Sequence, residues 1–274
     1  MSIYVNRSHV IQLEKRQNIA RRYHVVTKAI NTEYWNINSE TAHSMYVGSY
    51  GRGTAISTSD IDILVELPKT EFDKFNSSMG NGQSRLLQSI RKSIQKVYPR
   101  SDIRADGQIV KINFHDGIKF EILPVFQNSS VWNSSQDYTH PNTNNGGNWE
   151  TTNPKSEQEA MKMKNSQVYS NGLFYATCRH MRFVRDTYFS SYHLSGIVID
   201  SFVYVAMGNW RYNESGVSSS SKFGDYENVL LEYFNNHTIW GLSSLTLNTP
   251  GSNKLIETSN SVECLKKVLN KMAL

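Results

Sequence analysis

The chain is poor in cysteine, in long apolar segments and in blocks of like charge. Its 274 residues include two cysteines, Cys178 and Cys264, which give neither a disulfide framework nor the spacing of a metal-binding motif. No apolar run approaches the ~20 residues needed to cross a bilayer. The N-terminal residues lack the basic and then apolar order of a signal peptide. These absences predict a cytoplasmic protein without membrane association.

The charged residues do not point to one class of partner. The formal net charge is +5, but the Lys and Arg residues are scattered along the chain. Dispersed charge is typical of solvated helix surfaces, and a basic chain suits an anionic small molecule as well as a nucleic acid. The composition therefore leaves a nucleic-acid activator open without favouring one.

Hydrophobic periodicity divides the chain into a mixed α/β part and a helical part. Strands are predicted at 45–47, 60–65, 108–114 and 118–126, the last two joined by a compact turn. Helices are predicted within 7–35 and over 83–97, 156–166, 170–189, 193–208, 224–236 and the C-terminal segment. The polar segment 127–157 predicts a long loop. We therefore expect two lobes with a cleft between them.

The segment YVGSYGRGTAISTSDIDILVEL, residues 46–67, places two aspartates after a glycine-serine turn. On a strand, Asp60 and Asp62 project from one face, about 6.5–7 Å apart. Such like charges repel unless a cation lies between them, and Mg²⁺ prefers carboxylate and phosphate oxygens. Glu121, on a later strand, could supply a third carboxylate from the adjacent position of the sheet. Three converging carboxylates can hold two metal ions.

The turn before the aspartates complements them. Gly48 allows the backbone to approach a phosphate closely, and Ser49 adds a hydroxyl and an N–H at an expected helix start. Arg52 adds positive charge. A D-x-D pair alone also occurs on the solvent face of an edge strand. The combination of turn, spacer and carboxylates instead predicts a site for a triphosphate and its metal ions.

These residues resemble the DNA polymerase β-like nucleotidyltransferases. More narrowly, they resemble the bacterial cyclic-oligonucleotide synthases related to cyclic GMP-AMP synthase and oligoadenylate synthase. FEILPVF resembles the strand of the third metal ligand, GGNWETTNP the linker between lobes, and CRHMRFVRD with SSYHL a nucleotide-facing part of the helical lobe. The resemblance implies an α+β fold, with a mixed-sheet nucleotidyltransferase core and long N-terminal helix over 1–155. An oligoadenylate synthase-like helical lobe is implied over 156–274.

The resemblance also implies roles for individual residues. Asp60, Asp62 and Glu121 would bind two Mg²⁺ ions, for which Mn²⁺ can substitute, and Glu121 would also orient or deprotonate the acceptor hydroxyl. Gly48 and Ser49 would contact the donor β- and γ-phosphates. Further nucleotide contacts are implied for Arg52, Arg182, Ser191 and Tyr192, the last by stacking on the donor base.

Two departures from the family pattern keep alternatives open. The family usually has aspartate in place of Glu121 and lysine in place of Arg182. The gap from Arg182 to Ser191 is short, so Arg179 or Arg185 could take the phosphate-binding role instead. Tyr192 also fits as a packing residue of the helical lobe.

The implied activity joins NTPs into a cyclic di- or trinucleotide second messenger and releases pyrophosphate. Such a product implies a separate effector protein and a role in bacterial anti-phage signalling. Two alternatives share the same turn and aspartates or the same fold. One is a template-independent nucleotidyltransferase acting on RNA or protein, and the other is a non-catalytic nucleotide sensor.

Overall fold

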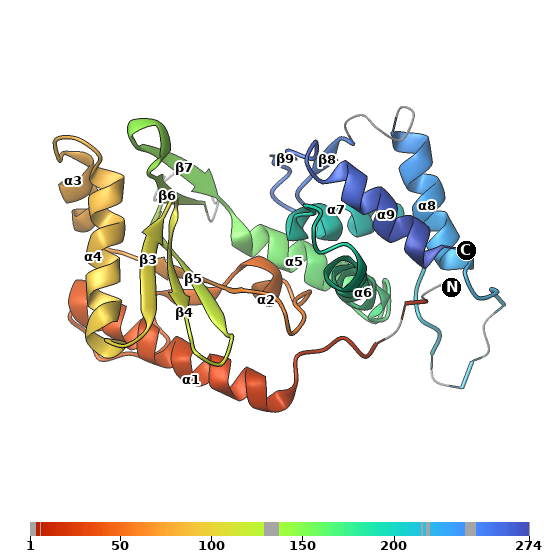
Figure 1. The fold of residues 1–274 in the computed structure, drawn as a ribbon, viewed down its shortest axis with the longest axis horizontal. Helices are drawn as coiled ribbons and strands as arrows, with labels where there is room; N and C mark the ends of the chain where they lie inside the picture. The colour runs from red at the N-terminus through yellow and green to blue at the C-terminus, as the bar shows by residue number, and fades with distance from the viewer. Residues whose placement is uncertain are drawn as a thin grey trace. The chain divides into compact units, whose positions relative to one another are not determined.

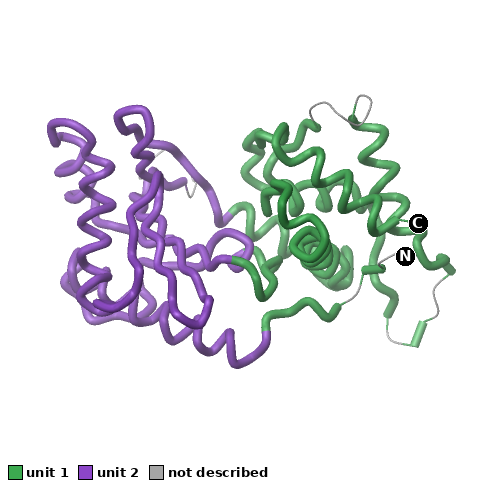
Figure 2. The backbone as a smooth tube through the Cα atoms, viewed as in Figure 1, with its two compact units in different colours: residues 1–11, 52–59, 156–274 green, residues 12–51, 60–155 purple. Residues whose placement is uncertain are grey.

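A computed structural model describes residues 4–5, 7–128, 137–214, 216–217, 220–238 and 245–273 (Figure 1). The chain forms two compact units, shown in Figure 2. Unit 1 comprises 1–11, 52–59 and 156–274, and unit 2 comprises 12–51 and 60–155. One boundary of these units coincides with the predicted division at residue 155, whereas 1–11 and the loop 52–59 group with the helical unit.

Unit 2 is built on a mixed sheet. Its strands are β1 Ser44–Tyr46, β2 Ile61–Glu66, β3 Asp102–Asp106, β4 Ile109–Asn113, β5 Lys119–Gln127, β6 Tyr138–Asn142 and β7 Asn148–Thr152. The strand order is β1-β2-β5-β4-β3, and β6 pairs with both β5 and β7. Strands β2 and β5 are parallel, and the other pairs are antiparallel. The predicted α+β class with a mixed sheet is confirmed.

The alternation of β2 and β5 separates an apolar face of the sheet from an acidic one. Ile61 and Ile63 of β2 and Phe120 and Ile122 of β5 are buried. Helix α1 Leu13–Ile30 contacts β2, and helix α4 Gly82–Val97 contacts β3 and β4 (Figure 1). Because successive strand residues point to opposite faces, the carboxylates between the apolar residues project from the other side of the sheet.

Local signals explain where the helices of unit 2 begin and end. Helix α1 is shorter than the predicted range and continues as a π-helical turn, η1 Asn31–Trp35, which ends at Asn36 in the left-handed conformation. Asn81 caps α4 by accepting a hydrogen bond from the Ser84 N–H at 2.8 Å. A further short helix, α3 Lys69–Asn76, was not predicted from the periodicity.

The predicted long loop over 127–157 is wrong in part. Strands β6 and β7 pair with each other in this segment, and η2 Asn144–Gly146 lies between them. Residues 129–136 lie outside the described residues. The side chains of β7 are exposed or half-buried, so Asn, Thr and Glu occupy a strand that has one neighbour. Such a strand lacks the apolar alternation by which strands are recognised in a sequence.

Unit 1 contains five of the described helices. They are α5 Pro154–Asn165, α6 Leu173–Tyr188, α7 Gly196–Ala206, α8 Asp225–His237 and α9 Val262–Met272. A small ladder pairs β8 Leu247–Asn248 with β9 Leu255–Ile256. Phe174, Met181, Phe202 and Leu265 belong to one fully buried apolar core. No helix in the described ranges is long and apolar enough to cross a membrane.

Candidate active site

A row of charged side chains crosses the sheet of unit 2. Asp62 of β2 is the register partner of Glu121 of β5, which in turn faces Lys111 of β4. Lys111 faces Arg104 of β3. The Lys111 Nζ lies 3.8 Å from Glu121 Oε1 and donates to Asp106 Oδ2 at 2.7 Å. Since adjacent strands are about 4.8 Å apart, the strand pairing brings the predicted carboxylates Asp62 and Glu121 side by side.

A second row begins at Asp60, immediately before β2. The Lys119 Nζ lies 4.0 Å from Asp60 Oδ1. Lys119 faces Asn113, whose Nδ2 donates to Asp102 Oδ2 at 3.0 Å. Asp60 and Asp102 therefore lie at the two ends of this row, with side chains 45% and 44% exposed. Asp102 has a similar exposed fraction to Asp60 and lies outside the predicted site.

Negative charge accumulates around Glu121. Burial raises the pKa of the Glu121 carboxyl, and the charge of Asp60 raises it further, while Lys111 opposes the shift. The pKa of Lys111 is raised, first by its hydrogen bond to Asp106. A carboxyl held in this way is easier to protonate and binds a cation that offsets the charge of its neighbours.

The glycine-serine turn packs directly against Asp62. Gly48 begins the short helix α2 Gly48–Gly51 with a φ of +57°. A Cβ on Gly48 would lie 1.8 Å from Asp62 Oδ2, so no larger residue fits without moving this carboxylate. The Val47 N–H donates to the Asp62 carbonyl oxygen at 2.9 Å, and the Gly51 N–H donates to Val47 O at 2.9 Å. The structure thus brings the turn and the second aspartate together.

The donor set suits a hard divalent cation. Asp60, Asp62 and Glu121 offer carboxylate oxygens from one sheet face, which are ligands that Mg²⁺ and Mn²⁺ accept. Within the described part of the chain, no three or more His, Cys, Asp or Glu side chains form a ready metal-binding group. Binding at these residues would therefore require side-chain adjustment around the pairing that the sheet fixes.

The comparison with protein families identifies the family of this chain. The model of the Second Messenger Oligonucleotide or Dinucleotide Synthetase (SMODS) domain matches residues 4–165. The chain belongs to the SMODS family. This assignment makes it an enzyme of the nucleotidyltransferase class and confirms the resemblance drawn from its glycine-serine and aspartate motif. No curated protein matches the chain.

Solved structures share the fold of this chain over most of its length. The CdnE cyclic dinucleotide synthase of Elizabethkingia meningoseptica is 14% identical, with a TM-score of 0.61, and the match covers 93% of this chain and 89% of that one. The CdnE c-di-GMP synthase of Capnocytophaga granulosa is 17% identical, with a TM-score of 0.63 and coverages of 94% and 78%. The Vibrio cholerae DncV cyclic AMP-GMP synthase is 12% identical, with a TM-score of 0.62 and coverages of 95% and 84%.

Two basic residues predicted to bind nucleotide are buried in unit 1 instead. Arg182 is 1% exposed and donates from Nη1 to Asp200 Oδ1 at 2.6 Å. Arg52 is 8% exposed and donates from Nε to Asp200 Oδ2 at 2.9 Å, with Nη1 3.5 Å from Glu157 Oε2. Carboxylates thus contact both guanidinium groups in this structure, and the nucleotide contacts of Arg52 and Arg182 stay predictions.

The residue that the sequence interpretation missed is Asp200. It lies in the apolar run GIVIDSFVYVA of α7 and is fully buried. A lone aspartate in such a run is the signal that could have revealed it, because a buried carboxylate requires a partner. The sequence did not indicate which of the basic residues would supply that partner.

The other predicted contacts of unit 1 lie on its surface. Ser191 and Tyr192 are exposed in the turn after α6, and the Lys267 Nζ lies 4.6 Å from the centroid of the Tyr192 ring. Their contacts with nucleotide stay predictions. Of the two alternatives to Arg182, Arg179 donates to the Gly53 carbonyl oxygen at 2.6 Å, and Arg185 donates to Asp186 Oδ1 at 2.6 Å.

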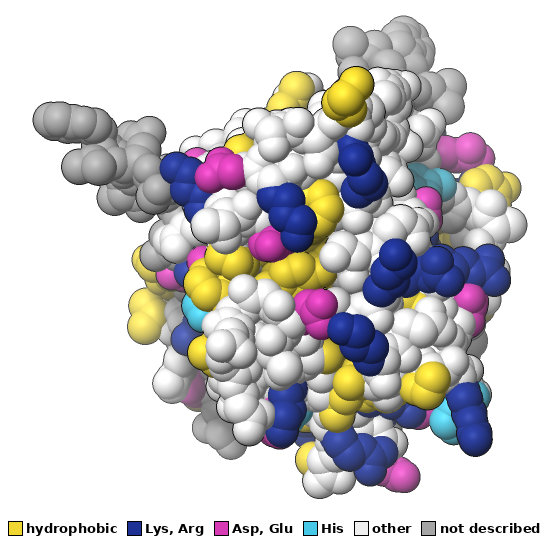
Figure 3. Space-filling model, turned by 90° about the vertical axis from the view of Figure 1, so that its left-hand side faces the viewer, with side chains coloured by type: hydrophobic (Ala, Val, Ile, Leu, Met, Phe, Trp, Pro, Cys, Tyr) yellow, Lys and Arg dark blue, Asp and Glu magenta, His cyan; other side chains and the backbone are white. Residues whose placement is uncertain are grey.

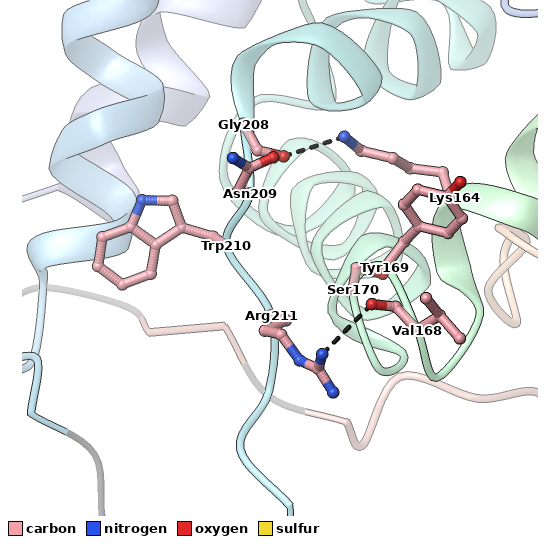
Figure 4. A pocket seen from close by; sticks show the side chains of 8 residues that line it. All are labelled: Lys164, Val168, Tyr169, Ser170, Gly208, Asn209, Trp210 and Arg211. Carbon is pink, nitrogen blue, oxygen red and sulfur yellow. Dashed lines mark hydrogen bonds between the residues drawn. The ribbon is translucent and has the colours of Figure 1, made fainter.

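A separate pocket of about 260 Å³ lies in unit 1 (Figure 4). At its rim, the Lys164 Nζ donates to Gly208 O at 3.0 Å, and Arg211 Nη1 donates to Val168 O at 3.2 Å. None of the predicted site residues lines it. On the face seen in Figure 3, Lys and Arg side chains are spread among acidic, apolar and uncharged surface. Basic charge on this face is therefore dispersed, as the sequence indicated.

Proposed function

We propose that this SMODS enzyme joins NTPs into a cyclic di- or trinucleotide at the sheet face of Asp60, Asp62 and Glu121. The observation that carries the proposal is the register pairing of Asp62 with Glu121, with Gly48 packed against the Asp62 carboxylate. Two of the solved structures are described as cyclic dinucleotide and cyclic AMP-GMP synthases, and one of them contains GTP and a nucleotide analogue. These descriptions support NTPs as the substrates.

The reaction is a displacement at phosphorus. The oxygen of an acceptor ribose hydroxyl attacks the α-phosphorus of the donor NTP, the bond to the bridging oxygen of the β-phosphate breaks, and pyrophosphate leaves. Glu121, whose pKa is raised by burial and by Asp60, accepts the hydroxyl proton. The backbone of Gly48 and Ser49 holds the donor phosphates. A second displacement closes the ring, so positioning and charge stabilisation supply most of the catalysis.

Divalent cations fit this proposal through the three carboxylates. Mg²⁺, or Mn²⁺ in its place, would be held as two ions by Asp60, Asp62 and Glu121 and would neutralise phosphate charge and acidify the attacking hydroxyl. The positions of these three carboxylates determine where the cations would bind. Lys111 lies near Glu121 and Lys119 near Asp60, so these lysines offset part of the negative charge of the carboxylates.

The proposal extends to the biological setting. A small diffusible product acts through a separate effector protein, which we place in bacterial anti-phage signalling. NTP substrates and the two buried free cysteines, Cys178 and Cys264, support a cytoplasmic location. The proposal also retains the predicted division into a core over 1–155 and a helical lobe over 156–274. The scattered basic residues leave a nucleic-acid activator open without favouring one.

The test is product analysis. Pure protein is incubated with the four NTPs and Mg²⁺ or Mn²⁺, and the phosphatase-treated products are analysed by mass spectrometry beside an Asp60→Asn/Asp62→Asn variant. We expect a phosphatase-resistant cyclic nucleotide that the variant does not make. Label transferred to RNA or protein would replace the proposal with a template-independent transferase. NTP binding without pyrophosphate release would replace it with a nucleotide sensor.

A further inference from the structure

The loop 52–59 connects the glycine-serine turn to Asp60, the first aspartate of the candidate site. Arg52 follows Gly51 of the glycine-serine turn, and Ser59 precedes Asp60. Although both neighbours belong to unit 2, the loop itself belongs to unit 1. The two ends of this loop are therefore chain neighbours of the turn and of the first aspartate.

Asp200 is the centre of the contacts that hold the loop. Its Oδ2 accepts hydrogen bonds from Arg52 Nε and Thr54 Oγ1, both at 2.9 Å. Its Oδ1 accepts from Arg182 Nη1 at 2.6 Å. Arg182 is in turn fixed on the helical unit, where it donates from Nη2 to Gly196 O at 2.9 Å. Two residues of the loop are thus bonded to one carboxylate of α7.

The charges of this network balance in the interior. Arg52 and Arg182 are matched by Asp200 and by Glu157, whose side chain is 14% exposed. Burial opposes the ionisation of Asp200, but the charges of Arg182 and Arg52 outweigh it and hold its pKa below the ordinary value. Removal of one member leaves a buried charge without its partner, which is strongly unfavourable. The network therefore has one well-defined arrangement.

Other contacts fix the loop in the same place. Arg179 donates from Nη2 to Gly53 O at 2.6 Å, and Thr58 Oγ1 donates to Asp186 Oδ2 at 2.5 Å. Gly53 has a φ of +75°, and a Cβ on it would lie 2.8 Å from the Tyr175 ring. Arg52, Gly53, Thr54 and Thr58 of the loop are therefore held by α6 or α7.

We propose that Asp200 is a positioning residue for nucleotidyl transfer, which acts through Arg52 and Thr54 to fix the segment between the glycine-serine turn and Asp60. The inference rests on the proposed function, because it assigns Asp200 a part in the same reaction. Displacement of reacting groups by about 1 Å can lower a rate about 10²-fold. A buried ionic network anchored on a helix is suited to prevent such displacement.

The test uses the full chain and three variants of the loop contacts. Thr54→Val removes one donor to Asp200 with little change of shape, and Arg52→Gln is compared with Arg52→Lys, which keeps the charge. Val268→Ala, a buried core substitution on α9, is the control for general destabilisation of unit 1. Each protein is assayed for pyrophosphate release, for its thermal midpoint and for hydrogen exchange of the amides over 48–60.

The expected result is local. Thr54→Val and Arg52→Gln lower kcat about 10-fold or more with KM within about 2-fold, and hydrogen exchange rises more over 48–60 than over the helices of unit 1. Arg52→Lys retains more activity than Arg52→Gln. Val268→Ala lowers the thermal midpoint, but kcat measured below that midpoint stays near that of the wild type.

Two results would overturn the inference. One is unchanged exchange over 48–60 in Thr54→Val and Arg52→Gln, and the other is a loss of kcat in Val268→Ala equal to theirs at matched stability. Failure of the proposed function is recognised separately, since wild-type protein would then release no pyrophosphate from any NTP. In that case the exchange measurement alone decides whether Asp200 fixes the loop.

Discussion

The Asp62 carboxylate is one reason why position 48 requires glycine. The backbone at Gly48 has a positive φ, and the space where a Cβ would lie is occupied by the Asp62 carboxylate. Glycine is the only residue that meets both conditions without strain or displacement. In the proposed site, the turn that would bind the donor phosphates thus rests directly on a predicted metal ligand.

This contact predicts the effect of Gly48→Ala. The variant strains the backbone by about 1–2 kcal/mol and displaces the Asp62 side chain, so we expect kcat to fall about 10²-fold or more. Gly107→Ala is the matched control, because Gly107 has a φ of +59° but open space where its Cβ would lie. Pyrophosphate release is compared at equal folded fraction, measured by circular dichroism. Equal activity of the two variants would contradict the account.

The residues of the site differ in how far the sequence predicts them. Strand alternation is a local property, so the sequence predicts Asp60 and Asp62 on one face, and pairing of β2 with β5 brings Glu121 beside Asp62. The contact of Arg52 with Asp200 could not be predicted, because Asp200 lies 148 residues further along the chain. No local pattern relates residues at that separation. Residue type alone does not tell a phosphate ligand from one half of a buried ion pair.

At the scale of elements, an ion pair joins α1 to the turn between β4 and β5. Arg22 donates from both terminal nitrogens to the two Asp116 carboxylate oxygens, each at 2.8 Å. The Arg22 guanidinium carbon also lies 4.2 Å from the centroid of the Phe114 ring. This bidentate, partly buried arrangement is more favourable than an exposed ion pair with one hydrogen bond. It fixes the helix against the edge of the hairpin.

The pair predicts a pH dependence of stability. The hydrogen bond from Arg22 holds the pKa of Asp116 below its ordinary value of 3.8. Because the folded pKa is the lower one, the stabilisation is complete above about pH 4 and is lost as the pH falls through the folded pKa. A double-mutant cycle of Arg22→Gln and Asp116→Asn, by urea unfolding, should give a coupling of about 1 kcal/mol at pH 7 that declines below pH ~4. A coupling that rises on acidification would contradict this assignment.

The hairpin of β6 and β7 is positioned by a glycine against α4. A Cβ on Gly147, which has a φ of +96°, would lie 2.5 Å from Gln83 Oε1 and 2.7 Å from Asn81 Oδ1. Asn81 is the cap of α4, so displacement of its side chain weakens the start of that helix. A close approach of this kind between a hairpin and a helix end cannot be predicted from the polar sequence of the hairpin.

We therefore expect Gly147→Ala to cost more than Gly146→Ala. Both positions have a positive φ, but a Cβ on Gly146 meets nothing within 4 Å. The difference should be about 1 kcal/mol in the free energy of unfolding, the usual contribution of a helix cap. Chemical denaturation of the two variants measures it. Equal stabilities would show that the Asn81 cap adjusts without cost.

At the scale of the whole chain, the fold class and the family were predictable because the most specific motif coincides with the centre of the sheet. The turn, β2 and β5 carry both the resemblance and the site geometry. The assignment of 1–11 and 52–59 to the helical unit was not predictable. Those segments join unit 1 through contacts distant in sequence, such as the 3.1 Å separation of His9 Nε2 from His180 Nδ1.

The central claim is that Asp60, Asp62 and Glu121 form the catalytic centre of a nucleotidyltransferase. The most direct measurement is pyrophosphate release from mixed NTPs by Asp60→Asn, with Asp102→Asn as the control at the opposite end of the same row. We predict that Asp60→Asn lowers kcat about 10³-fold while its circular dichroism spectrum is unchanged, and that Asp102→Asn retains activity. Equal activity of the two variants would contradict the claim.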